Sequence, residues 1–474
     1  MKLAYNMDYK TKTEEILEQA EDTSKKKYPS GSKVINKDTL LELCYDADVN
    51  ERYFYLLSAD ELEPKKVDSH QNMIPLSPES SIIKNKVILF PSKIEEYGDE
   101  EKLMDEIRNF IHKYLDISDE FEAVCAYYVM ISTLYEKMPV VPYLRVIGDY
   151  GSGKTRFLHV IGSISRNPIF ASGATTTSPM FRLISEFGGT FLMDEADFSS
   201  EMKSDMTKIL NQGNMPRFPV IRAHPHRPRD VISYNVFGPK IVATRGYFDD
   251  DALESRMITE KMENKKLRDG ILITIQDEFW EEGLHLRNKL LKFRMDHFFQ
   301  YQHIPITEHA DVDQALVKSL DPRQKQIIEP MLSLIKDADL KNVLLQRMKR
   351  HADDLKVNRG FSFDVDVLEI MLSLAFSGIE GLKKPHMQDI ADRFNAYFQE
   401  STRWKLTARK IGHILRTKFL LITSRDNKGF YIAESEENLK KIADRYDIDT
   451  GLLNEKYNQG TDPHKDITVG YSNF

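Results

Sequence analysis

Short apolar runs alternate with helix-like segments in the middle of the chain, between residues 143 and 262. Runs rich in Val, Ile, Leu, Met and Phe predict strands at 143–148, 168–173, 190–197, 240–245 and 257–262. Apolar residues three or four positions apart between these runs predict helices. This alternation is typical of a parallel sheet covered by helices, so we expect an α/β fold.

The flanking segments have other patterns. Helical apolar spacing covers 101–137 and 271–350, and a short strand is expected at 85–91. Beyond residue 360, three helical segments precede a strand, the turn DNKG and a second strand. Three helices followed by a strand–turn–strand predict a winged helix, which is a variant of the helix-turn-helix.

The turn after the first strand of the sheet carries the main chemical signal. Residues 148–155 read GDYGSGKT, which matches G-x-x-x-x-G-K-[ST] between a strand and a helix. In such a turn, backbone N–H groups and a lysine bind phosphates, and the hydroxyl ligates Mg²⁺. A glycine turn with a chance lysine is the alternative, but the complete motif favours binding of ATP and Mg²⁺. The expected binding residues are Gly148, Gly151, Ser152, Gly153, Lys154 and Thr155.

Acidic residues at the end of a later strand predict hydrolysis of that nucleotide. In GTFLMDEAD (189–197), Asp194 is placed to hold Mg²⁺ and Glu195 to polarise an attacking water. A small-molecule kinase has less use for that glutamate. The alternative is that Glu195 is a solvated turn residue.

Two further residues complete the expected catalytic group. Thr244 ends the strand KIVATR, where its hydroxyl can contact both the γ-phosphate and the water. Arg256 stands between a helix and a strand, from where it can reach the nucleotide of a neighbouring subunit. An ordinary surface arginine is the alternative for Arg256.

With these motifs in order, residues 140–262 resemble an AAA+ ATPase module. ALESRM (252–257) resembles the arginine-finger segment of minichromosome maintenance helicases. GTFLMDEAD, KILNQG, VFGPKIVATRG and DDALESR resemble segments of P-loop proteins from plasmids, phages and integrated elements, akin to the cassette-chromosome helicases. The resemblance implies a DNA-acting ATPase that forms a homo-oligomer, expected to be a hexameric ring. It also implies that Lys154, Thr155, Asp194, Glu195, Thr244 and Arg256 have the roles given above.

The chain departs from these families in three respects. Thr244 stands where asparagine is common. The second sensor arginine of the lid is not identified, and Arg287, Arg294 and Arg323 are its candidates. The first 95 residues show no zinc-binding cysteines, so the amino-terminal DNA collar of minichromosome maintenance proteins cannot be assumed.

We therefore expect an AAA+ P-loop parallel sheet sandwiched by helices, with a helical lid and a C-terminal winged-helix domain. The expected regions are an N-terminal accessory region (1–95), an ATPase core (96–270), a lid (271–355), a winged helix (356–435) and a tail (436–474).

Charge limits where nucleic acid can bind. The chain of 474 residues has a formal net charge of −8, so DNA contact must come from local basic patches. One is a predicted hairpin at 217–236, and the other lies at 401–430 in the predicted winged helix. The residues expected to contact a single strand in the ring channel are Arg222, His224, His226, Arg227 and Arg229. Those expected to contact duplex DNA are Arg409, Lys410, His413, Arg416 and Lys428.

Both assignments have alternatives. The hairpin can be a solvated loop or pack on an adjacent subunit, and some winged helices bind protein. An initiator or loader that hydrolyses ATP slowly, or an AAA+ protein remodeller, would share the ATPase motifs.

The remaining composition favours a cytoplasmic protein. The two cysteines lie far apart, which fits a reducing compartment, and no apolar run is long enough to span a bilayer.

Overall fold

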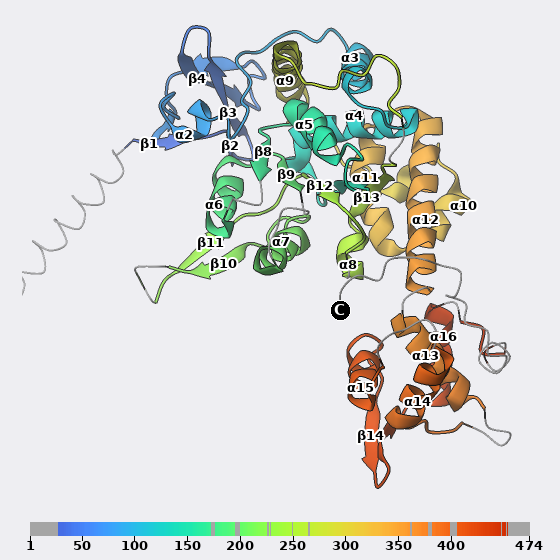
Figure 1. Ribbon diagram of the computed structural model, residues 1–474. Helices are drawn as coiled ribbons and strands as arrows, with labels where there is room; N and C mark the ends of the chain where they lie inside the picture. The colour runs from blue at the N-terminus through green and yellow to red at the C-terminus, as the bar shows by residue number, and fades with distance from the viewer. Residues whose placement is uncertain are drawn as a thin grey trace, which may run out of the picture. The chain divides into compact units, whose positions relative to one another are not determined.

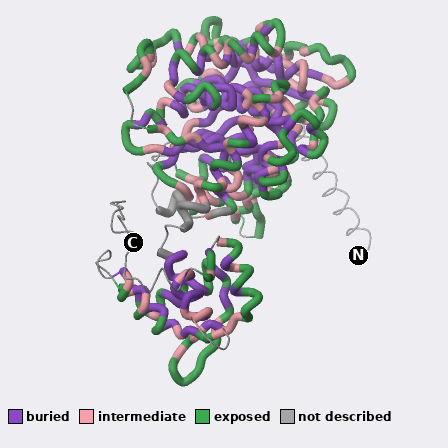
Figure 2. Tube along the Cα trace, turned by 90° about the vertical axis from the view of Figure 1, so that its right-hand side faces the viewer, coloured by how far each residue is buried: buried purple, intermediate pink, exposed green. Residues whose placement is uncertain are grey.

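The computed structural model describes residues 27–171, 176–194, 200–224, 227, 229–248, 250–263, 266–360, 363–377, 382–398, 405–446, 448–451 and 453. The chain divides into two compact units, Met1–Lys349 and Arg350–Phe474 (Figure 1). Each unit has its own buried interior, as Figure 2 shows. Within the described ranges, no helix combines the length and the apolar character needed to cross a membrane.

A five-stranded parallel sheet forms the centre of the first unit. Its strands lie in the order β13-β7-β12-β9-β8, and every neighbouring pair is parallel. They are β7 (Tyr143–Ile147), β8 (Ile169–Ala171), β9 (Phe191–Asp194), β12 (Lys240–Thr244) and β13 (Met257–Lys261). Each lies within a predicted run, because strands buried on both faces read as continuous apolar segments. All five strands end at one side of the sheet, here called the carboxyl edge, and begin at the opposite amino edge.

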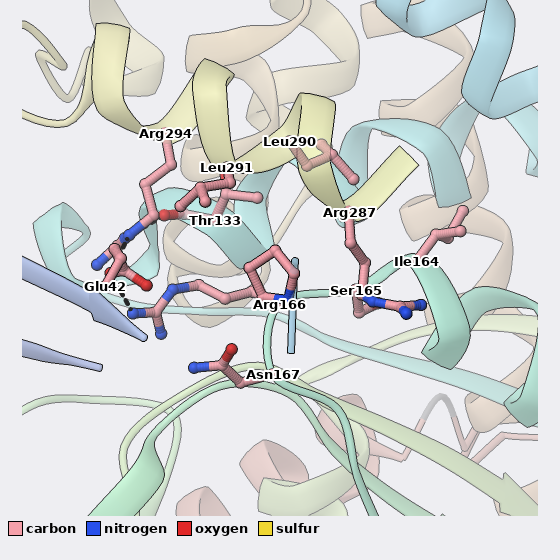
Figure 3. Close-up of a pocket in the computed structure, with 11 residues that line it drawn as sticks. Glu42, Thr133, Ile164, Ser165, Arg166, Asn167, Arg287, Leu290, Leu291 and Arg294 are labelled. Carbon is pink, nitrogen blue, oxygen red and sulfur yellow. Dashed lines mark hydrogen bonds and ion pairs between the residues drawn. The ribbon is translucent and has the colours of Figure 1, made fainter. Parts of the chain in front are cut away.

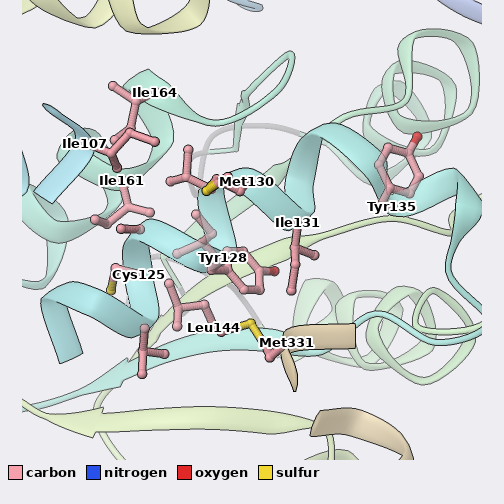
Figure 4. Close-up of a cluster of buried hydrophobic side chains, with 14 of the residues drawn as sticks. Ile107, Cys125, Tyr128, Met130, Ile131, Tyr135, Leu144, Ile161, Ile164 and Met331 are labelled. Carbon is pink, nitrogen blue, oxygen red and sulfur yellow. The ribbon is translucent and has the colours of Figure 1, made fainter. Parts of the chain in front are cut away.

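Helices cover both faces of this sheet. On one face, Leu144 and Ile241 belong to a hydrophobic cluster shared with the helices of the first group below. On the other face, Tyr143 and Val242 belong to a second cluster, shared with the helices of the second group. The first group is α3 (Glu100–Tyr114), α4 (Asp119–Leu134), α5 (Lys154–Ile164) and α9 (Asp277–His297); the second is α6 (Thr177–Phe187) and α7 (Ser200–Gln212). Figure 4 shows the first cluster, where Tyr128 of α4 and Ile161 of α5 lie near Leu144.

The segment expected to form a lid packs on this core. It contains α9, η3 (Ile306–Glu308), α10 (Gln314–Ser319), α11 (Pro322–Leu334) and α12 (Ala338–Gly360). Side chains of α11 and α12, such as Met331 and Leu344, are part of the same cluster as α4 and α5. Arg287 and Arg294 of α9 are buried, so two of the three candidate sensor arginines contribute to the core.

The N-terminal region holds a sheet that the sequence analysis did not predict. Four antiparallel strands lie in the order β2-β3-β4-β5, and β1 pairs with β6. They are β1 (Tyr28–Ser30), β2 (Lys33–Asn36), β3 (Thr39–Asp46), β4 (Glu51–Ser58), β5 (Lys65–Val67) and β6 (Met73–Pro75), followed by α2 (Ser81–Lys84). The prediction of a strand at 85–91 is wrong, because the pairing of this segment is limited to one isolated bridge, between Ile88 and Ile169. Lys86 has a φ of 52° and Pro91 has no N–H, so this segment does not pair continuously.

Buried ion pairs connect the N-terminal sheet to the core (Figure 3). The Glu42 carboxylate of β3 lies 2.8 Å from Arg166 Nη2 and 2.7 Å from Arg294 Nε, and Arg294 also pairs with Glu136. Burial raises the pKa of Glu42, but the two guanidinium groups outweigh it and lower that pKa below its ordinary value of 4.5. Buried charges are tolerated when they are paired in this way, and losing one partner is costly.

The second unit has the predicted order of elements. It contains α13 (Phe363–Ala375), α14 (Met387–Tyr397), α15 (Ala408–Thr417), an antiparallel hairpin of β14 (Thr423–Asp426) and β15 (Gly429–Ile432), and α16 (Glu436–Arg445). Its own core includes Phe394, Ile411 and Ile432. The region expected to be a polar tail therefore begins with a helix, α16, which buries Leu439 and Ala443.

Candidate nucleotide site

The turn between β7 and α5 needs glycine at several positions. Gly151 and Gly153 have φ values of +81° and +89°, in the left-handed region that other residues rarely adopt. A Cβ atom at Gly148 would lie 2.5 Å from the carbonyl oxygen of Met262 and would also clash with Ser152 Oγ. The turn therefore keeps its backbone uncovered just before the N-terminus of α5, where helix N–H groups favour anions.

Lys154 is held at the mouth of this turn. Its ammonium donates to the carbonyl oxygens of Gly148 and Asp149, each at 2.7 Å, and the residue is buried. A cation fixed beside exposed backbone N–H groups gives a site suited to phosphate oxygens.

Asp194 ends β9 beside the turn. Its Oδ2 accepts a hydrogen bond of 3.1 Å from Thr155 Oγ1 at the start of α5. A carboxylate and a hydroxyl oxygen at this distance are the kind of ligands that Mg²⁺ takes. The two residues therefore fit the role of metal ligands.

Thr244 ends β12, which lies between β7 and β9 in the sheet. Thr244 pairs in register with Ile147 of β7, and Gly148 N donates to the Thr244 carbonyl at 3.2 Å. The Thr244 hydroxyl is fully buried and has no hydrogen-bond partner among the described residues, and the same is true of Ser152 Oγ. Buried hydroxyl groups without partners are uncommon, and here they mark the carboxyl edge as a place for a polar ligand.

Arg256 lies at the opposite edge of the sheet. It directly precedes β13, its carbonyl accepts from Tyr143 N at 2.9 Å, and its Nε donates to Asn214 Oδ1 at 3.1 Å. Burial, and then the nearby Arg323, lower the pKa of Arg256. Five strand residues at about 3.3 Å each put about 17 Å between Arg256 and the carboxyl edge. The structure therefore does not bring Arg256 and Lys154 of one chain together. Glu195 lies outside the described residues.

A cavity of about 440 Å³ opens beside the glycine turn. This volume is in the range of small-molecule sites. Its lining includes Tyr114, Ile117, Gly151, Met262, Leu267 and Ile271. Phosphates at the turn and an organic base in the cavity would thus occupy one continuous site.

Two arginines tie together the loops around this cavity. Arg156 of α5 donates to the carbonyl oxygens of Tyr114 and Ile273, each at 2.8 Å. Arg268 bonds through its backbone N–H to Asp116 Oδ2 at 2.9 Å and through Nη2 to the Leu115 carbonyl at 3.2 Å.

The sequence analysis missed both arginines. The position of Arg156, directly after the G-K-T of the motif, was an available signal. Arg268 had none, because its partners lie more than 150 residues earlier in the chain.

The predicted basic hairpin is present as β10 (Val220–Ala223) and β11 (Val231–Tyr234). Arg222 is engaged within the unit, since its Nη2 lies 3.1 Å from Asp205 and its guanidinium lies 4.8 Å from the ring centre of Phe181. Arg227 pairs with Asp230 at 3.2 Å. Of the other residues expected to contact a single strand, His224 and Arg229 are described, and Arg229 is exposed. His226 lies outside the described residues.

In the second unit, α15 separates a buried face from a basic face. Ile411, Ile414 and Leu415 are buried, as their spacing predicts. The exposed residues are Arg409, Lys410, His413 and Arg416, together with Lys428 in the hairpin turn.

Comparison with known proteins gives distant similarity only. No protein-family model matches the chain, and no curated protein matches it. The C-terminal region of NrS-1 is 10% identical with a TM-score of 0.31, over 83% of this chain and 95% of that one. An MCM homolog from Methanopyrus kandleri is 11% identical with a TM-score of 0.31, over 68% and 75%. The active helicase SCCmec type IV Cch is 10% identical with a TM-score of 0.32, over 87% and 96%.

Proposed function

We propose that the first unit is an AAA+ ATPase. The observation that carries this proposal is the meeting of three separate segments at the carboxyl edge of the sheet. Lys154 and Thr155 follow β7, Asp194 ends β9 and Thr244 ends β12, and Thr155 bonds directly to Asp194. A glycine turn, a lysine, two oxygen ligands and an unsatisfied buried hydroxyl together suit a nucleoside triphosphate with Mg²⁺.

Each residue has a role in the proposed reaction. N–H groups of the turn and the Lys154 ammonium bind the phosphates, with phosphate oxygens taking the place of the two carbonyl partners of Lys154. Thr155 and Asp194 would hold Mg²⁺, which neutralises charge that develops on the phosphates. Glu195, next to Asp194 in sequence, accepts a proton from the attacking water, and the Thr244 hydroxyl orients that water.

Arg256 acts in this proposal on the nucleotide of a neighbouring subunit. The estimated 17 Å between the two edges of the sheet keeps it away from the phosphate turn of its own chain. In a homo-oligomeric ring, the amino edge of one subunit would face the carboxyl edge of the next. We propose a hexamer, in which Arg256 stabilises the charge of the transition state.

We further propose that ATP hydrolysis drives movement on DNA, as in a replicative helicase or translocase of a mobile element. The β10–β11 hairpin would contact a single strand in the ring channel, and the second unit, as a winged helix, would contact DNA through α15. The exposed basic face of α15 supports this in a chain whose net charge is −8. An initiator or loader that hydrolyses ATP slowly is the second candidate, since it would use the same residues.

The test is ATP hydrolysis by the purified protein, alone and with single-stranded or duplex DNA. Stimulation of several-fold by DNA, lost in Glu195→Gln and retained in the exposed control Glu278→Gln, supports a DNA motor. Slow hydrolysis that DNA does not change favours the switch or a protein remodeller. Unchanged hydrolysis by Glu195→Gln contradicts the catalytic assignment.

A further inference from the structure

An aromatic ring lies near two guanidinium groups in the second unit. Phe430 of β15 pairs directly across the hairpin with Arg425 of β14. The Cζ atom of Arg425 is 5.5 Å from the ring centre of Phe430, and that of Arg416, from α15, is 5.7 Å away. These three residues, here called the Phe430 cluster, come from three different elements.

The core of the unit does not account for this ring. Side chains alternate along a strand, so Phe430 and Ile432 lie on the same face of the hairpin. Ile432 is buried in the core, whereas Phe430 is 48% exposed. The hairpin thus extends its core-facing side beyond the core, where the Phe430 ring lies near the Arg416 guanidinium of α15.

A glycine within α15 makes room for one of the guanidinium groups. Gly412 lies one turn before Arg416, and a Cβ atom there would be 3.1 Å from Arg416 Nη1. Glycine inside a helix is less favourable than alanine, because it has more backbone freedom to lose on folding. Its presence lets the Arg416 side chain lie close along the helix, in the position it occupies beside Phe430.

The positive charge of the cluster is not neutralised by carboxylates of the described residues. No ion pair of Arg416 or Arg425 occurs among them, whereas Lys418 pairs with Asp364. Asp426, the acidic residue between 405 and 430, lies 3.0 Å from His386 Nε2. Both guanidinium groups are therefore available to an anionic partner.

We infer that the Phe430 cluster binds an unpaired base of single-stranded nucleic acid, with the base stacked on Phe430 and the adjoining phosphates held by Arg416 and Arg425. Stacking on an aromatic ring needs an open base face, which bases inside a duplex do not offer. Stacking of a base on an aromatic ring adds affinity without requiring a particular base, and guanidinium groups add phosphate contacts and cation–π attraction. This inference rests on the proposed DNA partner and gives the second unit a role beyond contact with a duplex.

Tryptophan in place of the ring provides a direct readout. The full-length variant Phe430→Trp is titrated with an oligothymidylate of about 15 nucleotides, without ATP, and its fluorescence is compared with that of the unaltered protein, which has two tryptophans. A stacked base should quench the added indole, so we expect quenching that the unaltered protein does not show. A duplex of the same length should cause much less.

Affinity for the same oligonucleotide is the second measurement. We expect Phe430→Ala to weaken binding roughly 10-fold, in line with the loss of one stacked base. Leu420→Ala, which alters a side chain that is 74% exposed in the same unit, is the matched control and should bind as the unaltered protein does. Phe430→Leu keeps an apolar side chain without the ring, so it separates loss of stacking from loss of folding.

The outcomes separate this inference from the proposed function. If the oligonucleotide binds but Phe430→Trp is not quenched and Phe430→Leu retains full affinity, the stacking site is wrong and the DNA partner stands. If the unaltered protein binds neither single-stranded nor duplex DNA, the DNA partner and the stacking site are both wrong.

Discussion

Several buried polar side chains at the two edges of the central sheet differ in whether they have hydrogen-bond partners. At the carboxyl edge, the hydroxyl groups of Thr244 and Ser152 have no partner among the described residues. At the amino edge, the Tyr143 hydroxyl donates to the Leu210 carbonyl at 2.8 Å, and Lys240 Nζ lies within hydrogen-bonding distance of three carbonyl oxygens. Satisfied groups stabilise the fold, whereas unsatisfied ones cost stability and mark where a ligand belongs. The amino edge also holds buried atoms without a hydrogen-bond partner among the described residues, Thr190 Oγ1 before β9 and Asn214 Nδ2 beside Arg256, so the contrast is between the groups named above and not between all polar groups of the two edges.

Arg256 is the expected exception, since it lies at the amino edge and is proposed to act in catalysis. Replacement by alanine should lower ATP hydrolysis by about 1,000-fold, because an arginine that stabilises transition-state charge contributes this much. Binding of ATP to the same chain should change little. The measurements are steady-state phosphate release and nucleotide affinity.

Mixing variants tests whether Arg256 works on a neighbour. Combined Arg256→Ala and Lys154→Ala proteins should regain part of the activity, since some interfaces then contain an intact lysine and an intact arginine. No recovery in a sample that forms mixed oligomers would assign Arg256 a structural role with Asn214.

Lys154 should behave as a residue of the binding edge. We expect Lys154→Ala to reduce hydrolysis roughly 100- to 1,000-fold, as loss of one well-placed donor to a charged transition state does. The melting temperature should hardly change, because Lys154 donates only to carbonyl oxygens of its own turn. Lys318→Ala, on the exposed side of α10, is the control for activity. A large fall in melting temperature would place Lys154 among the stabilising groups instead.

Lys240 should show the opposite behaviour. Replacement by methionine leaves the Val236 and Gly238 carbonyl oxygens without this donor, so the free energy of unfolding should fall by about 2 kcal/mol. Burial lowers the pKa of Lys240 to about 7 from 10.5. Between these pH values the unfolded chain binds a proton that the folded chain does not, so folded-state stability rises with pH.

Unfolding by urea at pH 7 and pH 9.5 tests whether stability rises with pH in this way. The stability gap between the unaltered protein and Lys240→Met should widen by up to about 1.4 kcal/mol per pH unit. A gap that narrows as the pH rises would contradict a lowered pKa.

Thr244→Val should have the smallest effect of these variants, and it should change stability and ATP hydrolysis in opposite directions. Valine has nearly the same shape but no hydroxyl, so the cost of an unsatisfied buried group disappears and stability should rise by about 1 kcal/mol. Hydrolysis should fall, by about 10-fold, because the water loses an orienting partner. If the variant is less stable than the unaltered protein, the Thr244 hydroxyl is satisfied and the two edges do not differ as described.

Sequence patterns predicted the sheet and the residues at its carboxyl edge. Apolar runs locate buried parallel strands, and residues that follow such strands meet at one edge whatever lies between them. The position of Arg268 beside the cavity was not predicted, because its contacts with Leu115 and Asp116 have no local sequence signature. The N-terminal sheet was missed for a related reason, since its long hairpin of Thr39–Asp46 and Glu51–Ser58 is buried unevenly and lacks strict alternation.

The Glu42 ion pairs also set an order for folding during synthesis. Glu42 and Arg294 are 252 residues apart. At 5–20 residues per second, the ribosome adds the arginine about 13 to 50 seconds after the glutamate. Until then, Arg166 is the one of these two arginines that is present to pair with the Glu42 carboxylate. The N-terminal sheet is therefore made first, and its ion pair with Arg294 can form only after α9 has been synthesised.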